Sequence, residues 1–460
     1  MVDEYDVIII GGGAAGENVA GRTQPGGLRT IIIEADLVGG ECSYWACMPS
    51  KALLRPAEVL AQARRVPAAL DAVTGTVDVE KTLRSRDAFA NQYDDYGQVK
   101  WVESIEADLI RGQARLAGPR RVSVETADGV RVLTAAKAVV LATGSRTAVP
   151  PIPGIEDVGA WSSRDIVTAK AVPDSIIVLG MGPVGAEMAQ AWRSLGSEVT
   201  VIDQAQADGF PKIEPFAVEA LVQQMEEDGI RVLLGASVEA VSRQGATATV
   251  RLASGAQIAG SELILATGRL PSTDDVGLET VGLTPGQRID VNDHLVVSEV
   301  EGDWLYAVGD VNGRALLTHQ GKYQARQAGD HILGKQTAAW ADNVAVPAVM
   351  FTDPQIASVG LTERQAREQA LNVRVVEMGW AVAASSLLGK DTKGGAKFIV
   401  DEDRRVLVGV TFAGPGAGEL IHAATIAIVG EVTLDRLWHA TPAFPTMSEI
   451  WLRFLESYGL

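Results

Sequence analysis

The hydrophobic pattern of the chain contains the same unit twice. Each copy begins with a short apolar run, residues 5–10 and residues 175–179, that leads directly into a glycine-rich turn. A helical segment and a second apolar run follow each turn. This order predicts a βαβ unit, in which a strand passes through a tight turn into a helix and then into a parallel strand. Because the unit recurs about 170 residues later, we expect two nucleotide-binding domains.

The two copies end in the same way. In the first, the second strand covers residues 30–33 and ends at Glu34. In the second, a helix is predicted from about residue 186 to residue 195, and the following strand covers residues 198–202 and ends at Asp203. An acidic residue therefore stands 23 residues after the first glycine of each turn, since 34 − 11 and 203 − 180 are both 23.

Shorter patterns mark the rest of the chain. Each unit closes with a buried strand and a small-residue turn, at residues 139–144 and 263–268. The proline-rich residues 150–154 are typical of a linker. After about residue 340, alternating strands such as residues 397–401 and 406–412 indicate a separate α+β domain that lacks a glycine-rich nucleotide turn.

The glycine-rich turns are typical of dinucleotide binding. The first glycine permits the turn, the second lets the backbone approach a pyrophosphate, and the third lets the helix pack closely with its N-terminus toward the phosphates. The acid at the end of the second strand can accept hydrogen bonds from ribose hydroxyls. The alternative is a pair of ordinary tight strand–helix turns. The residues predicted to contact dinucleotides in these turns are Gly11, Gly13, Ala14, Gly16, Gly180, Gly182 and Gly185.

Asp203 bears on the choice of nicotinamide cofactor. A carboxylate repels a 2′-phosphate, and residues 204–208 contain no arginine to receive one. The sequence therefore favours NADH over NADPH.

The chain has only two cysteines, Cys42 and Cys47. Residues 48–54 look like a helix start with a proline in the first turn, so Cys47 is expected just before the helix, where the helix dipole favours a thiolate. Lys51 adds positive charge nearby. We therefore predict a redox pair, although two buried core cysteines and a solvated surface lysine are the simpler alternatives.

Length and charge limit the class of protein. At 460 residues the chain is expected to form two to four domains. A net charge of −18 makes nucleic acid and anionic membrane surfaces poor partners. The start of the chain does not resemble a signal peptide, and no apolar run reaches membrane-spanning length, so we predict a cytoplasmic protein without membrane insertion.

With its two dinucleotide units and its two-cysteine helix start, the sequence resembles the FAD-dependent pyridine nucleotide–disulfide oxidoreductases along essentially its whole length. Asp310, after the apolar residues 305–308, is similar to the family's second flavin motif. Residues 351–362 are similar to the opening of the family's dimer-forming interface domain. The resemblance implies an α/β fold with two Rossmann-like dinucleotide-binding domains, an α+β dimerisation domain and a homodimer. The expected domains are FAD-binding (1–150), NAD(P)-binding (151–275), central (276–345) and interface (346–460).

The resemblance also implies roles for single residues. Glu34 would bind the ribose of the FAD adenosine, Asp310 the ribityl chain, and the backbone near Ala114 the adenine. Lys51 would lie by the flavin and pair with Glu187. Cys47 would be the sulfur that faces the flavin and Cys42 the sulfur that meets the acceptor. Further cofactor contacts are implied for Gly40, Thr143, Gly144 and Gly268, and contacts to the NADH adenosine for Asp203 and Val238.

The implied chemistry is a relay of electrons. NADH reduces FAD, the flavin reduces the disulfide through Cys47, and the released Cys42 attacks an acceptor disulfide.

The C-terminal part departs from the family pattern. The family's disulfide reductases carry a His-Pro-Thr-x-x-Glu run, in which the histidine exchanges protons with the thiol of the partner subunit. Here Phe444 stands in place of the histidine, and Glu449 keeps the place of the glutamate. A positioned acid–base group typically contributes about 10²–10⁴-fold in rate. His439 is nearby in sequence, but we expect it to be structural.

The cysteine loop departs as well. Tyr44, Trp45 and Ala46 stand where relatives usually have smaller or amide side chains and a glycine, and Glu41 stands where a threonine is usual. These changes indicate either different packing or a reshaped acceptor site. Mercuric reductase also lacks the histidine but uses a further cysteine pair near its C-terminus, which this chain lacks, so we predict no metal delivery and no metal site.

The sequence therefore predicts an FAD-dependent NAD(P)H oxidoreductase that passes electrons to a small-molecule acceptor, either quinone-like or a non-standard disulfide. Two alternatives stay open: a dihydrolipoamide dehydrogenase with a rearranged acid–base group, and a redox-responsive flavoprotein whose disulfide state alters a partner contact.

Overall fold

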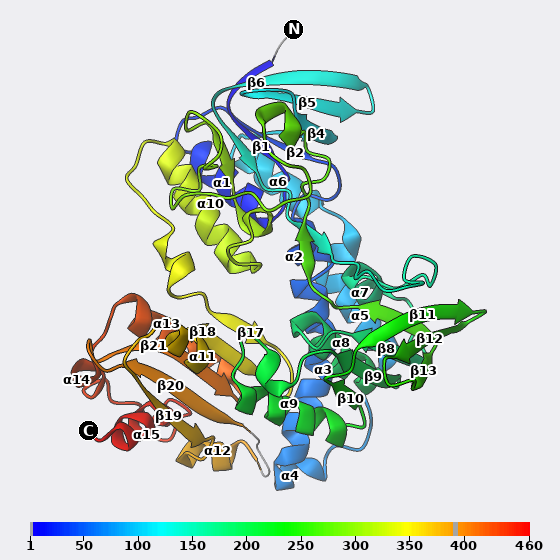
Figure 1. Cartoon of the computed structure of the whole chain (residues 1–460), viewed down its shortest axis with the longest axis vertical. Helices are drawn as coiled ribbons and strands as arrows, with labels where there is room; N and C mark the ends of the chain where they lie inside the picture. The colour runs from blue at the N-terminus through cyan, green and yellow to red at the C-terminus, as the bar shows by residue number, and fades with distance from the viewer. Residues whose placement is uncertain (1–2, 390–393) are drawn as a thin grey trace. The chain divides into compact units, whose positions relative to one another are not determined.

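A computed structural model describes residues 3–389 and 394–460. The chain divides into two compact units, each built from three stretches of sequence (Figure 1). The first unit contains Met1–Pro49, Asp87–Ala148 and Arg269–Asn343, and the second contains Ser50–Arg86, Val149–Gly268 and Val344–Leu460. The two units are described separately below.

A mostly parallel sheet forms the centre of the first unit. Its strand order is β3-β2-β1-β6-β5-β4, and β16 pairs with β6. The strands from β3 to β6, together with β16, are parallel, whereas β5 and β4 continue the sheet in the antiparallel sense. The strands predicted at residues 5–10 and 30–33 are confirmed. The strands of this unit are β1 (Asp3–Ile10), β2 (Thr30–Glu34), β3 (Asp108–Arg111), β4 (Gln113–Leu116), β5 (Arg121–Thr126), β6 (Gly129–Leu141), β7 (Ser145–Thr147), β15 (Arg269–Pro271) and β16 (Leu305–Ala307).

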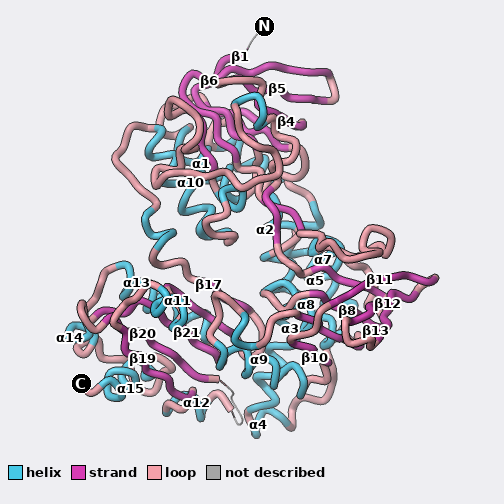
Figure 2. The backbone as a smooth tube through the Cα atoms, in the orientation of Figure 1, coloured by secondary structure: helices cyan, strands magenta, loops and turns pink. Residues whose placement is uncertain are grey.

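Helices α1 and α10 pack against each other beside this sheet (Figure 2). The approach is close, because a Cβ atom added to Gly329 would lie 2.7 Å from the Cβ atom of Arg22. Gly329 therefore lets the two helices approach closely at this point. The helices that begin in this unit are α1 (Ala14–Thr23), α2 (Gly40–Tyr44), α3 (Cys47–Arg65), α6 (Tyr96–Ser104) and α10 (Thr318–Ile332), with short 3-10 turns η1 (Asn91–Tyr93), η3 (Leu278–Val281), η4 (Gly309–Asn312) and η5 (Trp340–Asn343).

The second unit contains the second predicted βαβ unit. Its parallel sheet has the order β10-β9-β8-β14, and the strands predicted at residues 175–179 and 198–202 are confirmed. Helix α8 begins at Pro183, three residues before the predicted start at residue 186. Proline has the backbone angle that a first helical position needs, which explains the earlier start.

An antiparallel sheet, β11-β12-β13, accompanies this parallel sheet. The elements of this part are α4 (Pro67–Leu70), α5 (Val79–Phe89), α7 (Ser163–Thr168), β8 (Ser175–Leu179), α8 (Pro183–Leu195), β9 (Glu198–Asp203), η2 (Ala207–Gly209), α9 (Pro215–Glu227), β10 (Arg231–Leu234), β11 (Val238–Gln244), β12 (Thr247–Leu252), β13 (Gln257–Gly260) and β14 (Glu262–Leu265).

The C-terminal part of the second unit is an antiparallel sheet in the order β17-β18-β21-β20-β19, with helix α13 against strands β18 and β21. The predicted α+β segment is thus confirmed. Strands β20 and β21 are buried along their whole length rather than at alternate positions, which is typical of strands covered on both faces. The elements are β17 (Ala348–Met350), β18 (Ile356–Gly360), α11 (Glu363–Glu368), β19 (Val373–Gly379), α12 (Ala383–Leu387), β20 (Gly395–Asp401), β21 (Val406–Ala413), α13 (Ala417–Val429), α14 (Leu434–Leu437) and α15 (Glu449–Tyr458).

Within the described ranges, no helix is long and apolar enough to cross a membrane.

Candidate functional site

Cys42 and Cys47 form a disulfide, with their Cα atoms 4.7 Å apart. Cys42 lies in the short helix α2, and Cys47 is the first residue of α3. The sequence placed Cys47 just before the helix, so the helix begins one residue earlier than expected. Because the sulfur stands at the positive end of a 19-residue helix, the helix dipole favours a thiolate at Cys47 once the disulfide is reduced.

A threonine that sequence reasoning missed contacts this sulfur. The Thr318 hydroxyl lies 3.3 Å from Cys47 Sγ, and Thr318 is the first residue of α10. A hydroxyl donor beside the sulfur stabilises the thiolate further. Because 271 residues separate the two side chains, no local motif links them.

The first glycine-rich turn is tightly packed against its own sheet. A Cβ atom on Gly11 would lie 2.4 Å from the Ala142 carbonyl oxygen, and one on Gly16 would lie 1.9 Å from the Gly11 carbonyl oxygen. Only glycine fits at either position. Gly40 closes over the turn, since its Cβ atom would come within 2.8 Å of Gly13 Cα. The backbone amides at the start of α1, which begins at Ala14, are thus held in the arrangement that a pyrophosphate requires.

Glu34 is attached directly to this turn. Its Oε2 atom accepts a hydrogen bond of 2.6 Å from the Gly12 amide, and Oε1 accepts one of 2.7 Å from the Asp36 amide. Burial raises the pKa of Glu34, and these two amides oppose that rise. Each carboxylate oxygen can accept a second hydrogen bond, so the group can still bind ribose hydroxyls.

A polar side chain without a partner stands at the end of β6. The buried Thr143 hydroxyl makes no hydrogen bond to any residue that the structure describes. Gly144 follows with a φ of +71°, and nothing lies within 4 Å of the position that its Cβ atom would take. A donor of this kind beside open space fits a bound polar ligand.

Asp310 is held by two residues that the sequence did not reveal. Its Oδ2 atom accepts a hydrogen bond from the Ser145 hydroxyl and lies 3.7 Å from Arg269 Nε. Arg269 in turn donates to Ser145 Oγ over 2.6 Å. The carboxylate is thereby fixed in one orientation, as a group that positions a flexible polyol chain must be. Ala114, predicted near the adenine, lies buried in β4.

The second glycine-rich turn repeats the geometry of the first. A Cβ atom on Gly180 would lie 2.3 Å from the Ala266 carbonyl oxygen, and one on Gly185 would lie 1.9 Å from the Gly180 carbonyl oxygen. Asp203 Oδ2 accepts a hydrogen bond of 2.7 Å from the Met181 amide.

Three other predicted contacts of the nicotinamide nucleotide lie around this turn. Gly182 is the N-cap of α8, Gly268 follows β14, and Val238 begins β11. A Cβ atom on either glycine would meet nothing within 4 Å, so open space lies beside both. The donor set and the close-fitting glycines of the two turns therefore suit two dinucleotides, FAD at the first and NAD(P)H at the second.

Lys51 and Glu187 form the predicted ion pair in the second unit, with Lys51 Nζ 2.7 Å from Glu187 Oε2. Glu187 is nearly buried, and its Oε1 atom accepts a hydrogen bond of 3.0 Å from the Phe351 amide. Lys51 Nζ also lies 4.8 Å from the centre of the Phe351 ring, within cation–π range. Phe351 therefore fixes both members of the pair, a role that its sequence context did not indicate.

The C-terminal run has no acid–base group at Phe444, whose side chain is 76% exposed. Glu449 is buried, and it is already engaged: Oε1 accepts from Arg453 Nη2 over 2.7 Å and Oε2 accepts from the Ala383 amide over 3.3 Å. His439 is exposed after α14. The run therefore presents an apolar ring to its surroundings rather than a proton carrier.

Of the unusual residues in the cysteine loop, Tyr44 turns inward. Its side chain is buried, and its hydroxyl lies 3.0 Å from the Val38 carbonyl oxygen and 2.9 Å from Gln98 Oε1. Burial raises the pKa of Tyr44 well above its usual range. Tyr44 therefore packs the loop from behind, and of the replaced positions Trp45 and Ala46 remain partly exposed.

Comparisons with known proteins agree with this geometry. Residues 5–329 match the model of the pyridine nucleotide-disulphide oxidoreductases, and residues 346–453 match the dimerisation domain of the same family. The chain is 30% identical to mercuric reductase from Staphylococcus aureus, over 97% of the chain and 81% of that protein. It is 31% identical to dihydrolipoyl dehydrogenase from Rhizobium etli, over 100% of the chain and 99% of that protein.

Two solved structures are similar over nearly the whole length. The HOCl-induced flavoprotein disulfide reductase RclA from Escherichia coli, as its Cu(II) complex, gives a TM-score of 0.86 with 25% identity and covers 99% of both chains. LpdA from Mycobacterium tuberculosis gives 0.85 with 25% identity and covers 100% of both chains. The predicted fold class, with Rossmann-like domains and an interface domain, is confirmed. The chain therefore belongs to the pyridine nucleotide–disulphide oxidoreductase family, whose members are enzymes that use FAD and NAD(P)H.

Proposed function

We propose that this enzyme oxidises NADH and passes the electrons through FAD and the Cys42–Cys47 disulfide to a quinone-like or non-standard disulfide acceptor. The observation that carries the proposal is the exposed phenyl ring of Phe444, at the position where the family pattern has a histidine. A phenyl ring can neither take up nor release a proton. An acceptor that needs no proton handled at this position is therefore favoured.

The cofactor roles follow from the two turns. When bound, FAD supplies a ring system that takes a hydride from a nicotinamide and returns two electrons to a disulfide. Glu34 would bind the adenosine ribose of FAD and Asp310 its ribityl chain, while the amides at the start of α1 would bind its pyrophosphate. Asp203, which would repel a 2′-phosphate, supports NADH as the preferred nicotinamide.

The two cysteines of the disulfide would have different roles after reduction. Cys47, at the first turn of α3 and beside the Thr318 hydroxyl, would carry the stabilised thiolate. Cys42 would leave as the second sulfur and meet the acceptor. Reduction of a quinone takes two electrons from the dithiol and two protons, and the protons can come from the thiols and from solvent, so no histidine is needed.

The engagement of Glu449 supports the same acceptor class. In the family pattern this glutamate orients the histidine, whereas here Arg453 occupies one carboxylate oxygen. The remaining oxygen receives the Ala383 amide. The C-terminal run is thus adapted to an ion pair within its own helix, with no arrangement for proton transfer.

Assembly and domain limits are part of the proposal. The match to a dimerisation domain supports a homodimer. The FAD-binding (1–150), NAD(P)-binding (151–275), central (276–345) and interface (346–460) segments remain our proposed domains.

The test is an acceptor panel with FAD-loaded enzyme and NADH. We expect reduction of a benzoquinone or naphthoquinone to exceed reduction of lipoamide by about 10²-fold or more, the loss that removal of an acid–base group typically causes. Comparable rates with lipoamide would overturn the proposal in favour of a disulfide reductase of dihydrolipoamide dehydrogenase type. Negligible turnover with every acceptor would instead favour a redox-responsive flavoprotein.

Two variants test separately whether lipoamide reduction needs a histidine at position 444 and whether that histidine must be oriented by Glu449. Phe444→His alone should restore little lipoamide reduction, because Arg453 keeps Glu449 from orienting the new ring. Phe444→His combined with Arg453→Leu should restore about tenfold more than the single variant. The matched control is Arg453→Leu alone, which should leave lipoamide reduction unchanged.

A further inference from the structure

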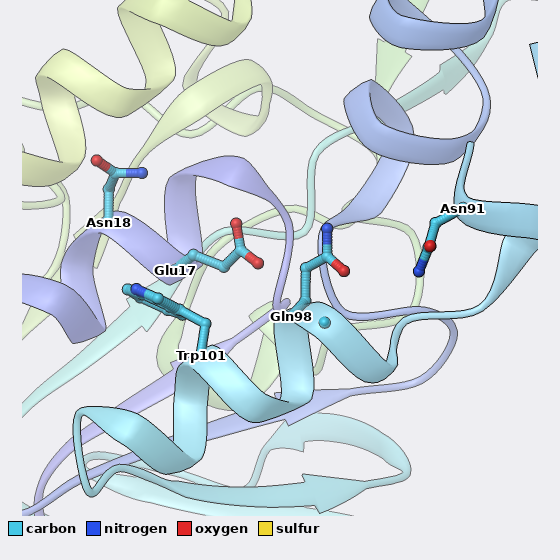
Figure 3. Close-up of a pocket in the computed structure, with 6 residues that line it drawn as sticks. Glu17, Asn18, Asn91, Gln98 and Trp101 are labelled. Carbon is cyan, nitrogen blue, oxygen red and sulfur yellow. The ribbon is translucent and has the colours of Figure 1, made fainter. Parts of the chain in front are cut away.

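An open pocket of about 560 Å³ lies in the first unit, beside helices α1 and α6. Its residues Glu17 and Asn18 follow directly after the first glycine-rich turn. Figure 3 shows the carboxylate of Glu17 between the indole ring of Trp101 and the carboxamide of Gln98. None of the lining residues is basic. They are Glu17, Asn18, Asn91, Gly97, Gln98 and Trp101.

The Glu17 carboxylate is unusual for its position. It is partly buried, yet neither of its oxygens makes a hydrogen bond or ion pair with any residue that the structure describes. Burial raises its pKa to about 7, Lys322 opposes that rise and Glu34 adds to it. A partly buried carboxylate without a partner is stabilised when a ligand supplies a positive charge.

Two side-chain amides of the pocket add hydrogen-bond acceptors beside the Glu17 carboxylate. Asn18 donates its Nδ2 group to the Ala14 carbonyl oxygen over 2.9 Å, and Asn91 donates to the Asp94 carbonyl oxygen over 2.6 Å. The side-chain oxygens of both amides therefore remain available to accept hydrogen bonds. Together with Glu17, they call for a ligand that donates N–H groups.

Trp101 supplies the apolar wall. Its ring packs on α1, since a Cβ atom on Gly21 would lie 3.3 Å from it, and 37% of the residue is exposed. Guanidinium and ammonium groups bind over indole faces by cation–π attraction, and a planar guanidinium stacks best. The net charge of −18 raises the local concentration of cations around the whole protein.

We propose that this pocket binds a small organic cation with a guanidinium or ammonium head group, which stacks on Trp101 and pairs with Glu17. The site is independent of the acceptor chemistry proposed above. It lies one hydrogen bond from the cysteine loop, because Gln98, which lines the pocket, accepts from the hydroxyl of Tyr44 in α2. A ligand here would therefore lie beside Gln98, the residue that accepts from the Tyr44 hydroxyl.

The test uses FAD-loaded enzyme and two probes of nearly equal shape. Methylguanidinium carries the charge, and methylurea is its neutral planar analogue. We expect saturable binding of methylguanidinium by calorimetry, with methylurea binding at least about tenfold more weakly. The affinity for methylguanidinium should fall as the pH is lowered through about 7, because protonation of Glu17 removes its charge.

Variants assign the binding to this pocket. Glu17→Gln and Trp101→Leu should each weaken methylguanidinium binding by about tenfold or more, whereas Trp101→Phe should retain part of it. Glu299→Gln, which removes the same charge from an exposed position of the same unit, is the matched control and should bind like the wild type. Equal affinity in Glu17→Gln and wild type, equal affinity for both probes, or no saturable binding to correctly folded enzyme would each overturn the proposal.

Discussion

Replacing Lys51 with methionine would leave a carboxylate in the interior without its partner. Lys51 Nζ lies 2.7 Å from Glu187 Oε2, and the side chain of Glu187 is only 4% exposed, whereas that of Lys51 is 36% exposed. Methionine fills a similar volume but carries no charge. Among the residues that the structure describes, the Phe351 amide would be the donor that Glu187 keeps.

The expected loss in the free energy of unfolding follows from the burial of Glu187. Removal of one partner from a buried ion pair typically costs about 3–5 kcal/mol. Since water reaches the lysine end of this pair and one backbone donor stays in place, we expect about 2–4 kcal/mol for Lys51→Met. For a domain of this size that corresponds to a fall in the melting temperature of about 5–10 °C.

The assay is thermal unfolding of four FAD-loaded proteins: wild type, Lys51→Met, Glu187→Gln and the double variant. The glutamine can still accept from the Phe351 amide, so the double variant should recover most of the stability lost in Lys51→Met. The coupling free energy should be about 2 kcal/mol. If Lys51→Met and the double variant melt at the same temperature, the unpaired carboxylate is not the cause and the reasoning fails.

Other predictions concern the sulfur, the second turn and the pocket. Thr318→Val removes the hydroxyl beside Cys47 Sγ, so alkylation of Cys47 in reduced enzyme should be slower at neutral pH than in the wild type; equal alkylation rates would exclude a role for the hydroxyl contact. Gly185→Ala places a Cβ atom 1.9 Å from the Gly180 carbonyl oxygen, so NADH affinity should fall at least about tenfold with FAD content retained; normal NADH titration would contradict this. The pKa of Glu17 is raised to about 7 by burial, so its ionised form disfavours folding. Stability should therefore fall as the pH rises from about 4.5 to about 7, by at most about 3 kcal/mol, and level off above that; Glu17→Gln should abolish the fall in pH-dependent melting.

The sequence by itself determined the features that depend on neighbours in the chain. A strand, a glycine-rich turn and a helix form wherever their local pattern occurs, so both βαβ units and the acids at Glu34 and Asp203 were predicted at their observed places. The disulfide was equally local, since Cys42 and Cys47 are five residues apart. Even the small errors, such as the early start of α3, lie at helix ends, where neighbouring residues compete most evenly.

The tertiary structure alone decided which distant side chains meet. Thr318 reaches Cys47 across 271 residues, and Ser145 reaches Asp310 across 165. Phe351 contacts both Lys51 and Glu187 and fixes their pair, and no sequence motif predicts these contacts.

Two further contacts gave no signal in the sequence for a related reason. The capture of Glu449 by Arg453 is a pair one helical turn apart, and such pairs are common on solvated helix faces. Because Glu449 is buried, its carboxylate has few other partners, and the bond from Arg453 takes up one of its oxygens. The open pocket at Glu17 also arises from separate segments, α1 and α6. Hydrophobic periodicity predicts single helices and strands. Contacts between helices and strands that are far apart in the sequence depend on how those elements pack in the complete fold.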